Sequence, residues 1–85
     1  MSRPTITSIE DAFGDRCVDL ILREGAWSWV ECRRDPEDAH GWRHLHPPRA
    51  GFADRQAALD DACGAVGWLA SILAARRGPT ARRQP

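Results

Sequence analysis

The chain is 85 residues long, and its twelve basic side chains balance twelve acidic ones. A domain of this size buries only about 60% of the surface that its unfolded chain exposes, which excludes an enzyme with its own cofactor-binding fold. Intrinsic disorder is also disfavoured, because four Trp, two Phe and a long aliphatic segment supply a core.

The charges are unevenly distributed along the chain. Residues 1–75 hold eight Arg against twelve acidic residues, a net charge of −4, whereas residues 76–85 hold four Arg and no acid, a net charge of +4. This distribution lacks the uniformly basic surface of many nucleic-acid-binding domains. The N-terminus lacks the apolar core of a signal peptide, and the longest uncharged stretch, Ala62–Ala75, is too short to span a membrane. We therefore expect a cytoplasmic protein without membrane association.

The first expected element is a short helix. Ser8 and Asp11 resemble a capping box, the pattern that opens many helices, and this helix would cover Ile9–Phe13 and end at Gly14. In a competing interpretation Ser8–Glu24 forms one helix, but Gly14 would then lie in its interior. The alternative stays open, and the sequence favours the short helix.

Three strands are expected next, as an antiparallel meander at residues 17–23, 26–33 and 42–46. Apolar and polar residues alternate along the first two, which is typical of half-buried strands. Glu24 and Gly25 lie between them as a tight turn, because Gly adopts positive φ without strain. The segment 35–41 is rich in turn residues, and Pro47-Pro48 cannot continue the third strand.

The clearest expected element is one long C-terminal helix. Asp54 is a good N-cap, and Gly78-Pro79 should stop the helix. Apolar residues recur at helical spacing and form its core stripe: Leu59, Ala62, Cys63, Val66, Leu69 and Leu73. The predicted fold is therefore α+β, a three-stranded antiparallel meander packed against one long C-terminal helix, with a short N-terminal helical turn. Residues 1–78 would form one compact domain and residues 79–85 a disordered Arg-containing tail.

Trp68 lies on the far side of this helix from the core stripe. A helix that is apolar all round is normally buried all round, yet a three-stranded sheet covers only one face. The sequence therefore predicts a second cover over Trp68, either the N-terminal segment or a partner chain. The expected function is a small non-catalytic protein-interaction module that forms a homodimer or binds another protein. The expected interface residues are Ala65, Trp68, Ile72, Gly64 and Gly67.

The alternative function is a nucleic-acid-associated protein. Two Trp and one Arg share a face of the second strand, and aromatic and Arg side chains together stack on bases. Glu31 interrupts this row and the body is negative, so nucleic acid is the less favoured partner. The residues expected to contact nucleic acid in this alternative are Trp27, Trp29, Arg33, Arg82 and Arg83.

The histidines and cysteines give only a weak indication of metal binding. A hairpin folded symmetrically about Asp38 would place Cys32 opposite His44, with His46 on the same side, and three such side chains can hold zinc. Their spacing matches no common zinc pattern, and a one-residue shift in register separates them, so their convergence stays open. We expect free, structural thiols at Cys17, Cys32 and Cys63, and no metal, cofactor or catalytic residue.

Overall fold

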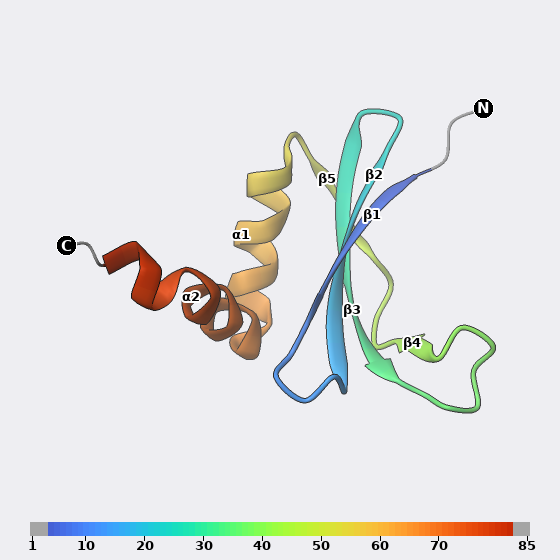
Figure 1. The fold of residues 1–85 in the computed structure, drawn as a ribbon. Coiled ribbons are helices and arrows are strands. Elements are labelled where there is room, and N and C mark those ends of the chain that lie inside the picture. The colour runs from blue at the N-terminus through green and yellow to red at the C-terminus, as the bar shows by residue number, and fades with distance from the viewer. Residues whose placement is uncertain (1–3, 83–85) are drawn as a thin grey trace.

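The computed structural model describes residues 4–82, and the side chains of residues 4–76. A five-stranded antiparallel sheet carries two helices on one side, while the loop before the fourth strand projects on the other (Figure 1). The elements are β1 (Thr5–Glu10), β2 (Arg16–Arg23), β3 (Ala26–Arg34), β4 (Trp42–His44), β5 (Arg49–Phe52), α1 (Arg55–Ala65) and α2 (Gly67–Arg82). The predicted α+β class is confirmed, but the three-stranded meander and the single long helix are wrong.

The N-terminal segment is a strand, so the predicted helix over Ile9–Phe13 is wrong, and so is the competing helix over Ser8–Glu24. β1 pairs antiparallel with β2 along its whole length. β-branched side chains favour an extended backbone, and four of them outweigh the capping pattern here. They are Thr5, Ile6, Thr7 and Ile9.

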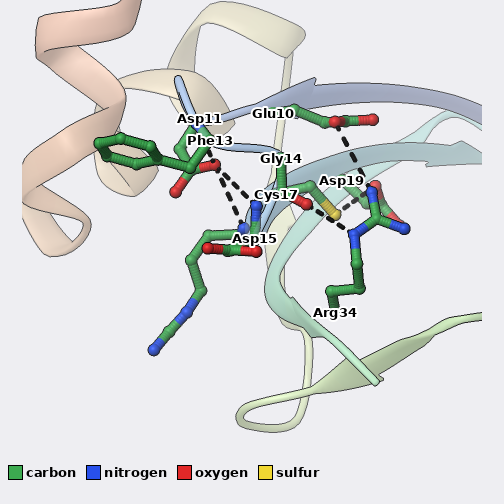
Figure 2. Close-up of polar contacts among 9 residues, drawn as sticks. Glu10, Asp11, Phe13, Gly14, Asp15, Cys17, Asp19 and Arg34 are labelled. Carbon is green, nitrogen blue, oxygen red and sulfur yellow. Dashed lines mark hydrogen bonds and ion pairs between the residues drawn. The ribbon is translucent and has the colours of Figure 1, made fainter. Parts of the chain in front are cut away.

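Asp11 caps the β1–β2 loop instead of a helix. Its Oδ1 accepts hydrogen bonds from the backbone N–H groups of Phe13, Asp15 and Arg16 at 3.2, 3.0 and 3.3 Å (Figure 2). Gly14, at φ +74°, completes the turn in a conformation that favours glycine. Burial acts to raise the pKa of Asp11, but these backbone hydrogen bonds hold it below its ordinary value.

The hairpin of β2 and β3 follows the prediction. The two strands are joined by Glu24 and Gly25 alone, and Arg23 pairs with Ala26 across the turn. Both turn residues have positive φ, at 53° and 78°, as a two-residue type I′ turn requires. The alternation of apolar residues thus sets the register of the two central strands.

Two short strands share the other edge of β3. β4 pairs with the end of β3 and β5 with its beginning, so the predicted third strand over residues 42–46 is cut to three residues. β5 has no counterpart in the prediction, because it is four residues long and contains Gly51 at φ +95° beside a break in its register with β3. Pro47 and Pro48 lie between the two strands.

The C-terminal helix breaks at Val66, which adopts an extended conformation with φ −116° and ψ 100°. Gly64 and Gly67 flank it, and glycine and valine are weaker helix formers than alanine or leucine. On one straight helix Val66 and Trp68 would point about 200° apart, at 100° per residue, so the sheet would bury only one of them. The break lets Val66 and Trp68 both pack against the core, which corrects the prediction of one continuous helix.

The helical region begins where the sequence predicts, but it does not end there. Asp54 is the N-cap of α1, as expected, and its Oδ1 accepts the backbone N–H of Ala57 at 2.8 Å. α2 runs to Arg82, so Gly78-Pro79 does not stop the helix. The side chains of residues 79–85 and all of residues 83–85 lie outside the described part of the chain, so the disordered tail predicted for residues 79–85 stays a prediction.

The sheet separates two apolar clusters. The main core, between sheet and helices, consists of Ile9, Val18, Leu20, Trp29, Ala58, Leu59, Ala62, Val66 and Leu69. A smaller cluster on the outer face consists of Cys17, Val30 and Cys32, with Ile21 and Trp42 packed against it. In the described residues 4–82, no helix has the length and apolar character needed to cross a membrane.

Candidate functional site

A cleft of about 370 Å³ opens beside the break between α1 and α2. It lies between the end of α1 and the segment that leads from β4 to β5. Its lining combines an apolar wall with charged and aromatic groups: Trp29, Glu31, His46, Pro47, Arg49, Ala65 and Val66. Three separate parts of the chain therefore build this cleft.

Glu31 is the acidic group of the cleft. It lies on β3, on the face that the helices cover, and its Oε2 accepts the indole N–H of Trp68 at 2.9 Å. Within residues 4–76 no arginine or histidine nitrogen lies within 4 Å of its carboxylate. Glu31 thus presents a half-buried negative charge with one hydrogen bond and no ion pair in the described part of the chain.

His46 fills a gap in the hydrogen bonding of the sheet edge. Its Nε2 accepts the backbone N–H of Glu31 at 3.1 Å, and its Nδ1 donates to the carbonyl oxygen of Pro47 at 2.7 Å. Because the backbone N–H can only donate and the carbonyl can only accept, these two bonds fix the neutral tautomer with hydrogen on Nδ1. At this point on the edge of β3, the imidazole accepts the N–H that a backbone carbonyl of a neighbouring strand would otherwise accept.

Asp61 and Arg49 form an ion pair beside Trp29. The indole N–H of Trp29 donates to Asp61 Oδ2 at 2.9 Å, and Arg49 Nε lies 3.1 Å from the same oxygen. The Arg49 guanidinium carbon lies 5.7 Å from the centre of the Trp29 ring, and the His46 ring meets that ring edge-on at 5.2 Å. Asp61 therefore neutralises the charge of Arg49, and among the described residues that line the cleft Glu31 keeps a negative charge without an ion pair.

The predicted interface residues divide into two groups. Trp68 and Ile72 are half-buried and pack against the main core, so the premise that the sheet leaves Trp68 uncovered is wrong. Gly64, Ala65 and Gly67 are exposed around the helix break, and Ala65 lines the cleft. A Cβ added at either glycine would meet no atom within 4 Å. These small residues leave open space beside the cleft.

The residues predicted to bind nucleic acid do not form one exposed surface. Trp29 is only 1% exposed and lies beneath α1, Trp27 is half-buried, and Arg33 is exposed. A base cannot stack on a ring that the helix already covers, so Trp29 does not serve as a stacking platform. The side chain of Arg82 and all of Arg83 lie outside the described residues.

The histidines and cysteines are arranged differently from the predicted zinc set. Cys32 pairs directly with His44, as a hairpin centred on Asp38 requires, but His46 turns to the Trp29 side of the sheet. The three side chains therefore do not converge. Instead, Cys32 lies beside Cys17 on the outer face, where the two residues are direct partners between β2 and β3.

Neither thiol on the outer face suits nucleophilic catalysis. Burial, followed by the negative charge of Asp19, raises the pKa of Cys17 far above its ordinary range, and the same two causes raise the pKa of Cys32. A thiol acts as a nucleophile through its thiolate, which these surroundings disfavour. The described residues thus offer a binding cleft on one face and two protonated thiols on the other.

Replacing Trp68 with phenylalanine tests the geometry at the helix break. The variant keeps the aromatic ring but loses the N–H that binds Glu31, and we expect it to be less stable by about 1 kcal/mol. The midpoint of urea unfolding measures this loss, and Glu31→Ala should remove the same bond, so the double variant should cost less than the two single losses combined. An unchanged midpoint for Trp68→Phe would mean that Trp68 faces away from the sheet.

Comparison of the chain with protein-family models, with curated proteins and with solved structures finds no match. The cleft and its charges are therefore the features of the chain that bear on its function.

Proposed function

We propose that the protein is a small non-catalytic protein-interaction module whose cleft binds an arginine side chain of a partner chain. The apolar wall of Pro47, Ala65 and Val66 suits the aliphatic stem of an arginine, and Glu31 suits its guanidinium. Cys17 and Cys32 lie side by side without a disulfide, which fits a reducing compartment, and we place the module in the cytoplasm.

The carboxylate of Glu31 carries this proposal. A half-buried carboxylate has lost part of its hydration, and the single hydrogen bond from Trp68 compensates for only part of that loss. A cation that binds the carboxylate offsets the remaining desolvation cost. Arginine suits the position better than lysine, because its planar guanidinium binds a carboxylate through two parallel hydrogen bonds. The neighbouring Arg49 does not compete, since it is already paired with Asp61.

The partner that we propose is a second copy of this chain. Residues 76–85 carry a charge of +4 and residues 1–75 a charge of −4, so two copies attract each other when the end of one meets the body of the other. Arg76 follows Val66 by ten residues, which is about 15 Å along a helix, beyond the reach of an arginine side chain. Arg76 therefore lies too far along α2 to occupy the cleft of its own chain, and in the proposed dimer it enters the cleft of the other copy.

The exposed small residues beside the cleft support a close approach. Gly64 and Gly67 have open space where a side chain would lie, so the backbone of a second copy can come near the helix break. Two copies related by a two-fold axis would each place arginines in the cleft of the other, which doubles every favourable contact. This arrangement predicts a homodimer with a dissociation constant in the micromolar range, because few side chains are buried on each side.

Light scattering over a range of micromolar concentrations tests the proposal. We expect the wild-type protein to reach the mass of a dimer, and we expect Glu31→Gln to weaken the dimer by at least about tenfold. The glutamine keeps an oxygen for the Trp68 indole and removes only the charge. The double variant Arg76→Gln, Arg77→Gln should weaken the dimer to a similar extent.

Glu37→Gln is the matched control, since Glu37 is exposed in the loop before β4 and lies outside the cleft. It removes the same charge from the body of the protein and should leave the dimer unchanged. A wild-type protein that stays monomeric throughout the range would overturn the proposal. Equal weakening of the dimer by Glu37→Gln and Glu31→Gln would also overturn the proposal. The dimer would then be held by the overall charge of the two copies and not by the carboxylate in the cleft.

A further inference from the structure

Four residues of metal-ligating types lie in one row across the outer face of the sheet. Glu10 pairs with Cys17, Cys17 with Cys32, and Cys32 with His44. Direct partners in an antiparallel sheet project from the same face, and this face is opposite to that of Trp29, because Cys32 follows Trp29 by three residues. The row is therefore separate from the cleft and its helices.

Two cysteines of this row converge with Asp19. The Sγ atoms of Cys17 and Cys32 and a carboxylate oxygen of Asp19 all lie within 4.8 Å of one another. The distance from Cys17 Sγ to Asp19 Oδ1 is 3.7 Å (Figure 2). Ligands of a tetrahedral zinc ion lie about 3.3–3.8 Å apart, given Zn–S and Zn–O bonds of about 2.3 and 2.0 Å. The distances between the three ligand atoms thus need to shorten by less than about 1.5 Å for the atoms to share one ion.

We propose that Cys17, Cys32 and Asp19 form a binding site for a thiophilic divalent cation of the zinc class. Two sulfur ligands and one carboxylate oxygen favour zinc over magnesium or calcium, which prefer oxygen alone. All three ligands come from adjacent positions on β2 and β3, so the central hairpin holds them rigidly. The bound cation would tie the two central strands together on the face that no helix covers.

The charges around the thiols favour a cation. Cys17 is 3% exposed and Cys32 is 1% exposed, and Asp19 places a carboxylate against them. A divalent cation between these groups would bind both sulfur atoms directly and neutralise the carboxylate.

His44 is placed to supply the fourth ligand. It is the direct partner of Cys32 on β4, it projects from the same face, and it is exposed. An exposed imidazole changes its rotamer at little cost, whereas Glu10 lies beyond Cys17 with Arg34 4.0 Å from its carboxylate. The completed set would be two cysteines, one aspartate and one histidine, each from the outer face.

Titration of the reduced full-length protein with Co²⁺ tests this site. Cobalt replaces zinc in tetrahedral sites, and its bond to thiolate gives a charge-transfer absorption band. We expect one Co²⁺ per chain, displacement of that ion by Zn²⁺, and a rise in melting temperature on addition of Zn²⁺. Asp19→Asn should bind at least about tenfold more weakly, a loss that even outer-shell partners of a metal can cause.

Three further variants decide the outcome. Cys32→Ala should abolish the absorption band, His44→Ala should weaken binding while the band stays, and Cys63→Ala is the control that removes a thiol outside the site. If Cys32→Ala fails to fold, Asp19→Asn still tests the site, because its side chain is only half-buried. Absence of the band in the wild type would overturn the proposal. A band that Asp19→Asn and Cys32→Ala both keep, or that Cys63→Ala removes, would also overturn it.

Discussion

Replacing Trp29 with alanine should leave most of the protein unfolded at room temperature. Its side chain is 1% exposed, packs in the main core, and donates a hydrogen bond to Asp61 of α1. Truncation of a buried tryptophan costs about 3–5 kcal/mol, and a domain of this size has a net stability of the same order. The variant also leaves Asp61 without its indole donor, which adds to the loss.

Near-ultraviolet circular dichroism and urea unfolding measure this effect. The matched control is Trp27→Ala, because Trp27 lies on the same face of β3 but is only half-buried, next to Phe52 of β5. We expect the control to stay folded with a lower unfolding midpoint. A folded Trp29→Ala variant as stable as Trp27→Ala would show that α1 does not pack over Trp29.

The second large effect is expected for Leu69→Glu in α2. Leu69 is completely buried against the main core, and a carboxylate there would lose its hydration without gaining a partner. The expected destabilisation exceeds about 4 kcal/mol, which is enough to unfold the domain. The neighbouring Ala70 is exposed on the same helix, so Ala70→Glu adds the same charge one residue away and should be nearly neutral.

Thermal unfolding of the two variants in parallel measures the difference. If both variants melt like the wild type, α2 is not packed on the sheet through Leu69. If both variants unfold, the added charge is responsible, and a variant without a charge is needed to test the packing of Leu69. We expect Leu69→Ala, which adds no charge, to lower the melting temperature strongly.

The central hairpin is the part of the fold that the sequence predicts best. Alternating apolar residues lead to a Glu24-Gly25 turn, and local pattern and turn chemistry agree there. The N-terminal segment is predicted wrongly, because the side chain of Asp11 caps a loop and a helix with the same kind of hydrogen bond. The composition of Thr5–Glu10, rich in β-branched residues, is the signal that would have identified β1.

The break at Val66 was not predictable from helical spacing alone. A wheel drawn through residues 59–73 gives a satisfactory core stripe, and it assumes one straight axis. The weak signal is the pair of glycines around Val66, together with an apolar Trp68 that a straight helix would leave uncovered. The interpretation of Trp68 as a contact for another chain followed from that assumption, and Glu31 of the same chain takes its indole N–H.

The cleft itself depends on contacts that no local pattern contains. In the sequence, Glu31 appears only as a charge that disfavours nucleic-acid binding, and His46 only as a weak candidate for a metal ligand. Both gain their roles from the β4–β5 connection, where the imidazole of His46 accepts the backbone N–H of Glu31 at the edge of β3. Such a role becomes visible only when the register of both short strands is known.

In the proposed dimer, the cleft of one copy receives arginines from the end of α2 of another. Two variants that reverse the charge on opposite sides of this contact test the arrangement most directly. Glu31→Lys should be monomeric, because its cleft would repel arginine, and the double variant Arg76→Glu, Arg77→Glu should be monomeric, because its α2 would repel Glu31. Circular dichroism and thermal unfolding first establish that each variant is folded.

Mixing the two folded variants in equal amounts should restore a dimer, since each cleft then meets residues of the opposite charge. Light scattering of the mixture at the concentration where the wild type is a dimer is the decisive measurement. We expect a 1:1 complex with the mass of two chains, and its dissociation constant should rise with salt concentration because the contact is ionic. A mixture that stays monomeric while the wild type dimerises would contradict the claim and assign the dimer to a different surface.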